Sequence, residues 1–183
     1  MWHRRNKYEG FTFTELVIVV VMVSLFVLMA VTKLGGLLRK STFRAQAEEF
    51  VSIMQMAVNA AAESNRRYEV IIDLVEQSYT LREITTPELS EVLEEEVIVD
   101  NNFSGNCQVV YVLFDDLVET DEDHQMAKFR AGHAGWQNGG KILLLDEDEQ
   151  PYTVVVNRIN GLVRLEKGDV ELLMPKTKDE VPF

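Results

Sequence analysis

Residues 10–31 read GFTFTELVIVVVMVSLFVLMAV, and this stretch decides how the rest of the chain is organised. From Leu16 to Val31 it contains no charged residue and only one hydroxyl group, that of Ser24. A helix needs about 20 mainly apolar residues to cross a bilayer, and residues 11–34 exceed that length. Because backbone amides in lipid must be paired within their own segment, this run is predicted to be a membrane-spanning helix despite its many valines.

Two other interpretations of this stretch stay open. A buried core helix is one of them, but such a helix would show a polar face, and this one shows none. A cleavable secretory signal peptide is the other. Its apolar region would be about 7–15 residues long and would end at small residues spaced A-x-A, whereas Leu28-Met29-Ala30 places a bulky residue there.

The acid Glu15 lies near the start of the apolar run, where an unpaired charge is unfavourable. It follows Phe11 by one helical turn, so it could reach the start of its own helix or of a neighbouring one. If the chain were cut after Gly10, Phe11 would carry a positive amine that Glu15 of a neighbouring subunit could neutralise. The alternative is an interfacial acid that simply reaches water.

The residues Gly10-Phe11-Thr12-Phe13-Thr14-Glu15, followed by an unbroken apolar run, resemble the processing site of type IV pilins and type II secretion pseudopilins. The resemblance implies cleavage between Gly10 and Phe11 by prepilin peptidase, N-methylation of Phe11 and use of Glu15 in filament assembly. Phe13 stands where leucine is common in that family. Many major pilins carry a proline within the mature helix; the first proline here is Pro87, which favours a minor pilin or pseudopilin.

Charge is distributed unevenly along the chain, whose net charge is −12. Residues 1–44 carry seven basic and two acidic residues, whereas residues 45–183 carry eleven basic and 28 acidic ones, a net charge of −17. An acidic domain repels phosphate backbones, so we expect no binding to nucleic acid. Basic residues flank the apolar run on both sides. Orientation therefore follows from the resemblance, which implies one pass through the inner membrane, a cytoplasmic N-terminus and a periplasmic C-terminal domain.

The rest of the chain shows two successive periodicities. Apolar residues spaced by three and four predict an amphipathic helix: Phe43, Ala47, Phe50, Met54, Ala57 and Ala61. Alternating patterns then predict strands at 68–75, 79–84, 97–99, 108–114, 126–130, 141–145, 152–159 and 162–166, with Asn160-Gly161 as a hairpin turn. The predicted divisions are a leader at 1–10, a membrane helix at 11–34, an amphipathic helix at 35–66 and a β-rich periplasmic domain at 67–183.

This order predicts an α+β fold in which a long N-terminal helix packs on an antiparallel sheet. Over the whole chain after residue 10, the pattern resembles the H-type minor pseudopilins, the GspH/FimT-like family. There, a helix with an alanine-rich stripe precedes β-hairpins and a late strand–turn–strand unit, as residues 154–165 do here.

Signals for catalysis are poor, and we expect no enzyme. His124 and His133 lack a partner at metal-ligand spacing, and Cys107 has no local nucleophile signature. As the single cysteine, Cys107 also excludes an internal disulfide, and a small buried apolar role is typical for it. Trp136 and Phe103 could contact a partner, although such aromatics more often close the edge of a sheet.

We expect no cofactor, with calcium as an open alternative. Calcium takes six to eight oxygen ligands, and two acidic runs could supply them, although neither fits an EF-hand and such runs are more often solvated. The residues are Asp115, Asp116, Asp121, Glu122 and Asp123 in one run, and Asp146, Glu147, Asp148 and Glu149 in the other.

The sequence as a whole predicts a minor pseudopilin or minor pilin whose partners are prepilin peptidase, other pilin-like subunits and the inner membrane. Two alternatives remain. A FimT-like minor pilin for DNA uptake would be supported by a basic C-terminal patch, but the tail from Lys167 is mixed in charge. The other alternative is a signal-anchored periplasmic domain outside any filament.

Overall fold

The structure, a computed structural model, describes residues 12–85, 96–120 and 124–172. Contacts divide the chain into two units, 1–39 and 40–183. One helix, α1 (Phe13–Ser64), runs from the first unit into the second. Gly35 and Gly36 do not interrupt it. Asn65 has a φ of 56° and ends the helix, because a left-handed residue cannot continue it.

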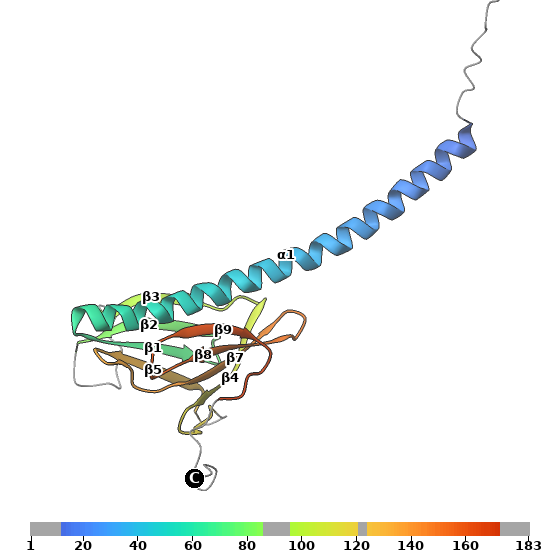
Figure 1. Cartoon of the computed structure of the whole chain (residues 1–183). Helices are drawn as coiled ribbons and strands as arrows, with labels where there is room; N and C mark the ends of the chain where they lie inside the picture. The colour runs from blue at the N-terminus through green and yellow to red at the C-terminus, as the bar shows by residue number, and fades with distance from the viewer. Residues whose placement is uncertain (1–11, 86–95, 121–123, 173–183) are drawn as a thin grey trace, which may run out of the picture. The chain divides into compact units, whose positions relative to one another are not determined.

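The second unit contains two antiparallel sheets. The five-stranded sheet has the order β3-β2-β1-β5-β6, and the four-stranded sheet has the order β4-β7-β8-β9. Figure 1 shows the green end of α1 lying along both sheets. The strands are β1 (Arg67–Asp73), β2 (Ser78–Ile84), β3 (Val97–Asn102), β4 (Cys107–Phe114), β5 (Met126–Gly132), β6 (Gly135–Trp136), β7 (Gly140–Asp146), β8 (Pro151–Val156) and β9 (Val163–Lys167).

The predicted apolar stripe of α1 is the centre of the core. All six of its residues from Phe43 to Ala61 are buried, and they share one cluster with residues of both sheets. The five-stranded sheet contributes residues such as Val70 and Phe129, and the four-stranded sheet contributes Ile142 and Val154. Because alternate residues of a strand face opposite sides, each sheet turns one face towards this core. The α+β fold expected from the sequence is confirmed.

Three local predictions differ from the structure. The strand predicted at 97–99 extends to Asn102, because Asn101 and Asn102 pair with Tyr79 and Ser78 across the sheet. The short strand β6 lies between the strands predicted at 126–130 and 141–145, where none was predicted, and it pairs with the end of β5.

The third difference is the β8–β9 hairpin, which is longer than the predicted two-residue turn. The Asn157 side chain accepts hydrogen bonds from the amides of Ile159 and Asn160, so the loop runs from 157 to 162. Gly161 alone in it has a positive φ, of 69°.

Candidate functional site

The first part of α1 is apolar around its whole circumference. The segment Phe13–Ala30 has a mean hydropathy of 2.6, and none of it is buried. The hydroxyl of Ser24 donates to the carbonyl of Val20 at 2.8 Å, so this polar group is satisfied within the helix. The segment is long and apolar enough to cross a membrane, as a single-pass anchor requires.

Glu15 lies in the first turn of α1 and is exposed. Its backbone amide donates to the Thr12 hydroxyl at 3.3 Å, so Thr12 acts as the N-cap of the helix. Among the residues that the structure describes, nothing forms a hydrogen bond or ion pair with the Glu15 carboxylate. Gly10 and Phe11 lie outside the described residues, so cleavage between them and methylation of Phe11 stay predictions.

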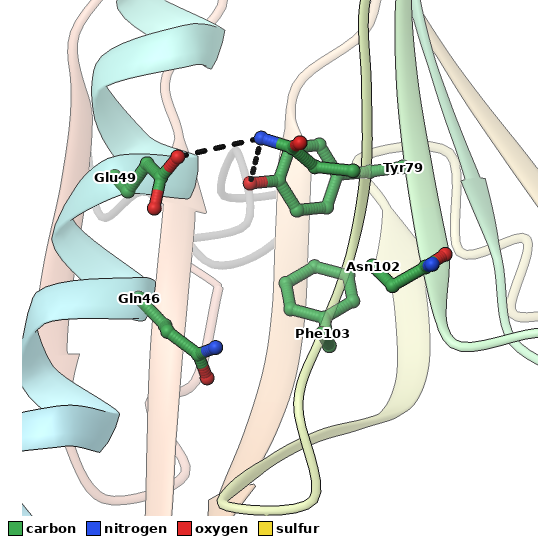
Figure 2. A pocket seen from close by; sticks show the side chains of 6 residues that line it. Gln46, Glu49, Tyr79, Asn102 and Phe103 are labelled. Atoms are coloured by element: carbon green, nitrogen blue, oxygen red, sulfur yellow. Dashed lines mark hydrogen bonds between the residues drawn. The ribbon is translucent and has the colours of Figure 1, made fainter.

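A polar pocket of about 170 Å³ lies between α1 and the end of the five-stranded sheet. Figure 2 shows Gln46 and Glu49 of α1 on one side and Tyr79 and Phe103 on the other, with the amide of Asn102 pointing away from the helix. Asn101 completes the lining, and its Nδ2 donates to Glu49 Oε1 at 3.3 Å and to the Tyr79 hydroxyl at 3.4 Å. Burial raises the pKa of the Tyr79 phenol, which therefore stays neutral.

A buried charge network occupies the opposite face of the five-stranded sheet. Glu69 on β1 accepts from Arg82 Nη2 at 2.6 Å and from Arg130 Nε at 2.7 Å, on the strands to either side. Arg82 also donates to Glu96 at 3.3 Å, and Glu96 accepts from the amide and the hydroxyl of Thr85. The sequence pattern does not reveal this network, because charges within strands usually indicate a solvated face.

A second polar cluster ties the segment after β9 to the outer face of the four-stranded sheet. Lys141 Nζ lies 2.6 Å from Asp169 Oδ1, and the Tyr111 hydroxyl donates to the same carboxylate at 3.1 Å. The hydrogen bond from Lys141 lowers the pKa of Asp169, with the bond from Tyr111 adding to the effect against burial. The Thr153 hydroxyl also donates to the carbonyl of Gly168 at 2.6 Å.

Within the part that the structure describes, acids of the two runs considered for calcium form ion pairs or hydrogen bonds with other residues of the chain. Asp115 lies 3.5 Å from Arg158, and Asp116 accepts from the amide of Val118. Asp146 caps its own turn by accepting from the amides of Asp148 and Gln150. Within the described ranges, no three His, Cys, Asp or Glu side chains gather as metal ligands. Residues 121–123 lie outside those ranges.

The remaining candidates are mostly core residues. Cys107 is buried, and burial raises the pKa of its thiol to about 12, which leaves little of the nucleophilic thiolate. Phe103 packs on Phe50 and Tyr79 at ring-centroid distances of 5.2 and 4.8 Å. Trp136 is buried against Phe129, and its indole nitrogen has no hydrogen-bond partner within the part of the chain that the structure describes.

Comparisons with known proteins show which fold this arrangement resembles. No protein-family model matches the chain, and no curated protein matches its sequence. Among solved structures, the minor pseudopilin EpsH from the type 2 secretion system of Vibrio cholerae matches with a TM-score of 0.50. The chain has a pseudopilin-like fold. The match covers 68% of this chain and 96% of EpsH at 13% sequence identity, so what is shared is the pseudopilin-like arrangement of helix and sheets.

Proposed function

We propose that the chain is a minor pseudopilin or minor pilin, a structural subunit of a periplasmic pseudopilus of a type II protein secretion system or of a type IV pilus. The observation that carries the proposal is the division of α1. Its segment Phe13–Ala30 is apolar and exposed on every face, whereas the stripe from Phe43 to Ala61 is buried against two sheets. A helix of this kind can pass from the membrane into a filament while its domain stays folded.

In this proposal prepilin peptidase cuts after Gly10 in the inner membrane, and Phe11 is methylated. The carboxylate of Glu15 then pairs with the amine of Phe11 on a neighbouring pilin-like subunit. Two features support that role: the Glu15 carboxylate has no partner among the described residues, and no basic residue lies between Phe11 and Lys33. Leaving the carboxylate unpaired in an apolar environment would be unfavourable.

Processing tests the proposal. Co-expression with a prepilin peptidase should shorten the chain by the ten-residue leader 1–10 and leave a methylated Phe11, as intact mass would show. Gly10→Val should block the cut, because a branched side chain does not fit beside the scissile bond. Asn6→Val adds the same side chain within the leader and should be processed normally. An intact leader in the wild type, or a cut near Ala30, would remove the main support.

A FimT-like minor pilin for DNA uptake is the second candidate, and a signal-anchored domain outside any filament is the third. The DNA-uptake pilin needs a basic surface, and the net charge of −17 over residues 45–183 weighs against it. The position of the mature N-terminus, which intact mass would give, distinguishes the filament subunit from the signal-anchored alternative.

A further inference from the structure

Asn102 ends the edge strand β3 and begins a motif for N-linked glycosylation. Residues 102–104 read Asn-Phe-Ser, an asparagine followed after one residue by a hydroxyl side chain, and the sequence contains this motif at no other place. Modification at such a motif needs an exposed asparagine on a segment that has left the cytoplasm. The structure tests the first of these two conditions, and the proposed function supplies the second.

The two neighbouring asparagines of β3 have opposite surroundings. Asn101 is half-buried, and its Nδ2 donates to Glu49 and to the Tyr79 hydroxyl. Asn102 is exposed and its amide points away from the helix (Figure 2). Within the described ranges, the side chain of Asn102 has no hydrogen-bond partner. Of the two, Asn102 therefore has the free amide nitrogen that an enzyme can reach.

The position of Asn102 at a sheet edge leaves room for a bulky group. β3 pairs with β2 on one side, and among the described strands none lies on its other side. A sugar chain on Asn102 would extend into solvent. It would also shield the open edge of β3, where unpaired backbone groups can pair with another chain.

We infer that Asn102 is an acceptor for N-linked glycosylation on the periplasmic side of the membrane. The inference rests on the proposed function, which assigns residues 67–183 to the periplasm. The enzyme is an oligosaccharyltransferase, and the donor is an oligosaccharide linked to a lipid pyrophosphate. Nδ2 of Asn102 forms a bond to C1 of the first sugar while the bond between C1 and the pyrophosphate oxygen breaks. The lipid pyrophosphate leaves with the electron pair, and the amide nitrogen loses one proton.

The fold determines when this transfer takes place. Phe103 is buried, and its amide donates to the carbonyl of Gln77 at 2.7 Å. The Ser104 hydroxyl donates to Gln46 of α1 at 2.7 Å. An enzyme that reads residues 102–104 must draw all three into its own site, which these contacts oppose in the folded domain. Transfer therefore takes place during export, before this end of β3 packs against α1, and the folded domain then keeps Asn102 at the surface.

Mass spectrometry of the full-length chain, exported in a bacterium that carries a single-subunit oligosaccharyltransferase and its lipid-linked oligosaccharide, tests the inference. The chain should gain the mass of one oligosaccharide, on the peptide that contains Asn102. Asn102→Gln and Ser104→Ala should each lose this gain, and Ser104→Thr should keep it because the hydroxyl remains. Asn101→Gln is the matched control and should also keep it. A gain that survives Asn102→Gln would contradict the assignment.

Timing has its own measurement. The purified, unmodified chain should accept the oligosaccharide more slowly than a peptide of residues 98–106, because the folded chain must first open locally. Equal rates would contradict the order of transfer before folding.

A second acceptor separates failure of the site from failure of export. Residues 100–104, DNNFS, are appended after Phe183 in a chain that carries Asn102→Gln. If the appended acceptor is modified but Asn102 of the wild type is not, the inference is wrong and the periplasmic domain of the proposed function stands. If neither is modified while another exported acceptor protein in the same cells is, the domain has not been exported, and both the inference and the proposed function are wrong.

Discussion

Arg82 and Glu69 face each other across β2 and β1, with Nη2 2.6 Å from Oε2, and their side chains are 1% and 0% exposed. Because the register pairs Glu69 with Arg82 on one side and with Arg130 on the other, one carboxylate joins three neighbouring strands. Such a network is costly to desolvate, yet each member, once buried, depends on its partners. The network therefore fixes the register of β1, β2 and β5.

Arg82→Met should destabilise the domain by about 3–5 kcal/mol, because it removes the cation that lies between Glu69 and Glu96. Urea unfolding of residues 40–183 would measure the loss. Arg66→Met is the matched control: Arg66 pairs with Glu83 at 2.9 Å but is 62% exposed, so its loss should cost less than about 1 kcal/mol. Equal costs for the two variants would contradict a role for the network in stability.

The contact between Asp169 and Lys141 should make the segment after β9 sensitive to acid. The pKa of Asp169 is lowered from its ordinary 3.8, so its charged form stabilises the folded state above pH 3.8. That contribution is lost as the pH falls through the lowered pKa of the folded state. Hydrogen exchange of the Val170 amide, which donates to Thr153, should accelerate below about pH 4 beyond the intrinsic pH dependence of exchange.

Asp169→Asn is the control for this measurement, since it keeps the shape but cannot titrate. Its protection at Val170 should be weaker than wild type at neutral pH and should converge with wild type in acid. The difference should be small, because the Asp169 side chain is about half exposed and solvent screens the pair. If the difference in Val170 protection between the wild type and Asp169→Asn persists unchanged well below pH 3, the Asp169 carboxylate is not responsible for it.

Glu15→Ala should leave membrane insertion and peptidase cleavage intact while weakening incorporation into filaments, because the Phe11 amine of a neighbour loses its counter-charge. Glu15→Asp should be partly tolerated, as the charge remains and only the reach shortens. Crosslinking to other pilin-like subunits in membranes, with cleavage scored in parallel, measures both steps. Normal crosslinking by the alanine variant would mean that apolar packing suffices.

The segment 41–183 should be soluble, should show mixed α and β signals by circular dichroism, and should not retard DNA at about 0.1 M salt. Its acidic charge balance is the reason. Tight binding under these conditions would move the function to the DNA-uptake alternative.

Local periodicity carried most of the fold prediction. The spacing of Phe43, Ala47 and Phe50 predicts the buried stripe, and alternation predicts the strands close to their observed limits. The predicted strand boundaries were wrong where pairing between strands outweighed the turn propensity of the residues. Asn101 and Asn102 favour turns by themselves, but the ladder with β2 holds them extended.

The sequence by itself determined that residues 11–34 suit a membrane, that one helix precedes a set of strands, and that Glu15 is the acid placed within the apolar run. These features depend on composition and on neighbours a few residues away. Only the tertiary structure decided that Glu69 meets Arg130, 61 residues later, and that Glu49 shares a pocket with Tyr79 and Asn101. Such contacts depend on strand register and on how the helix lies across the sheets. A one-residue shift of β1, β2, β3 or β5 would turn its residues among these, such as Glu69 or Tyr79, to the other face of the sheet.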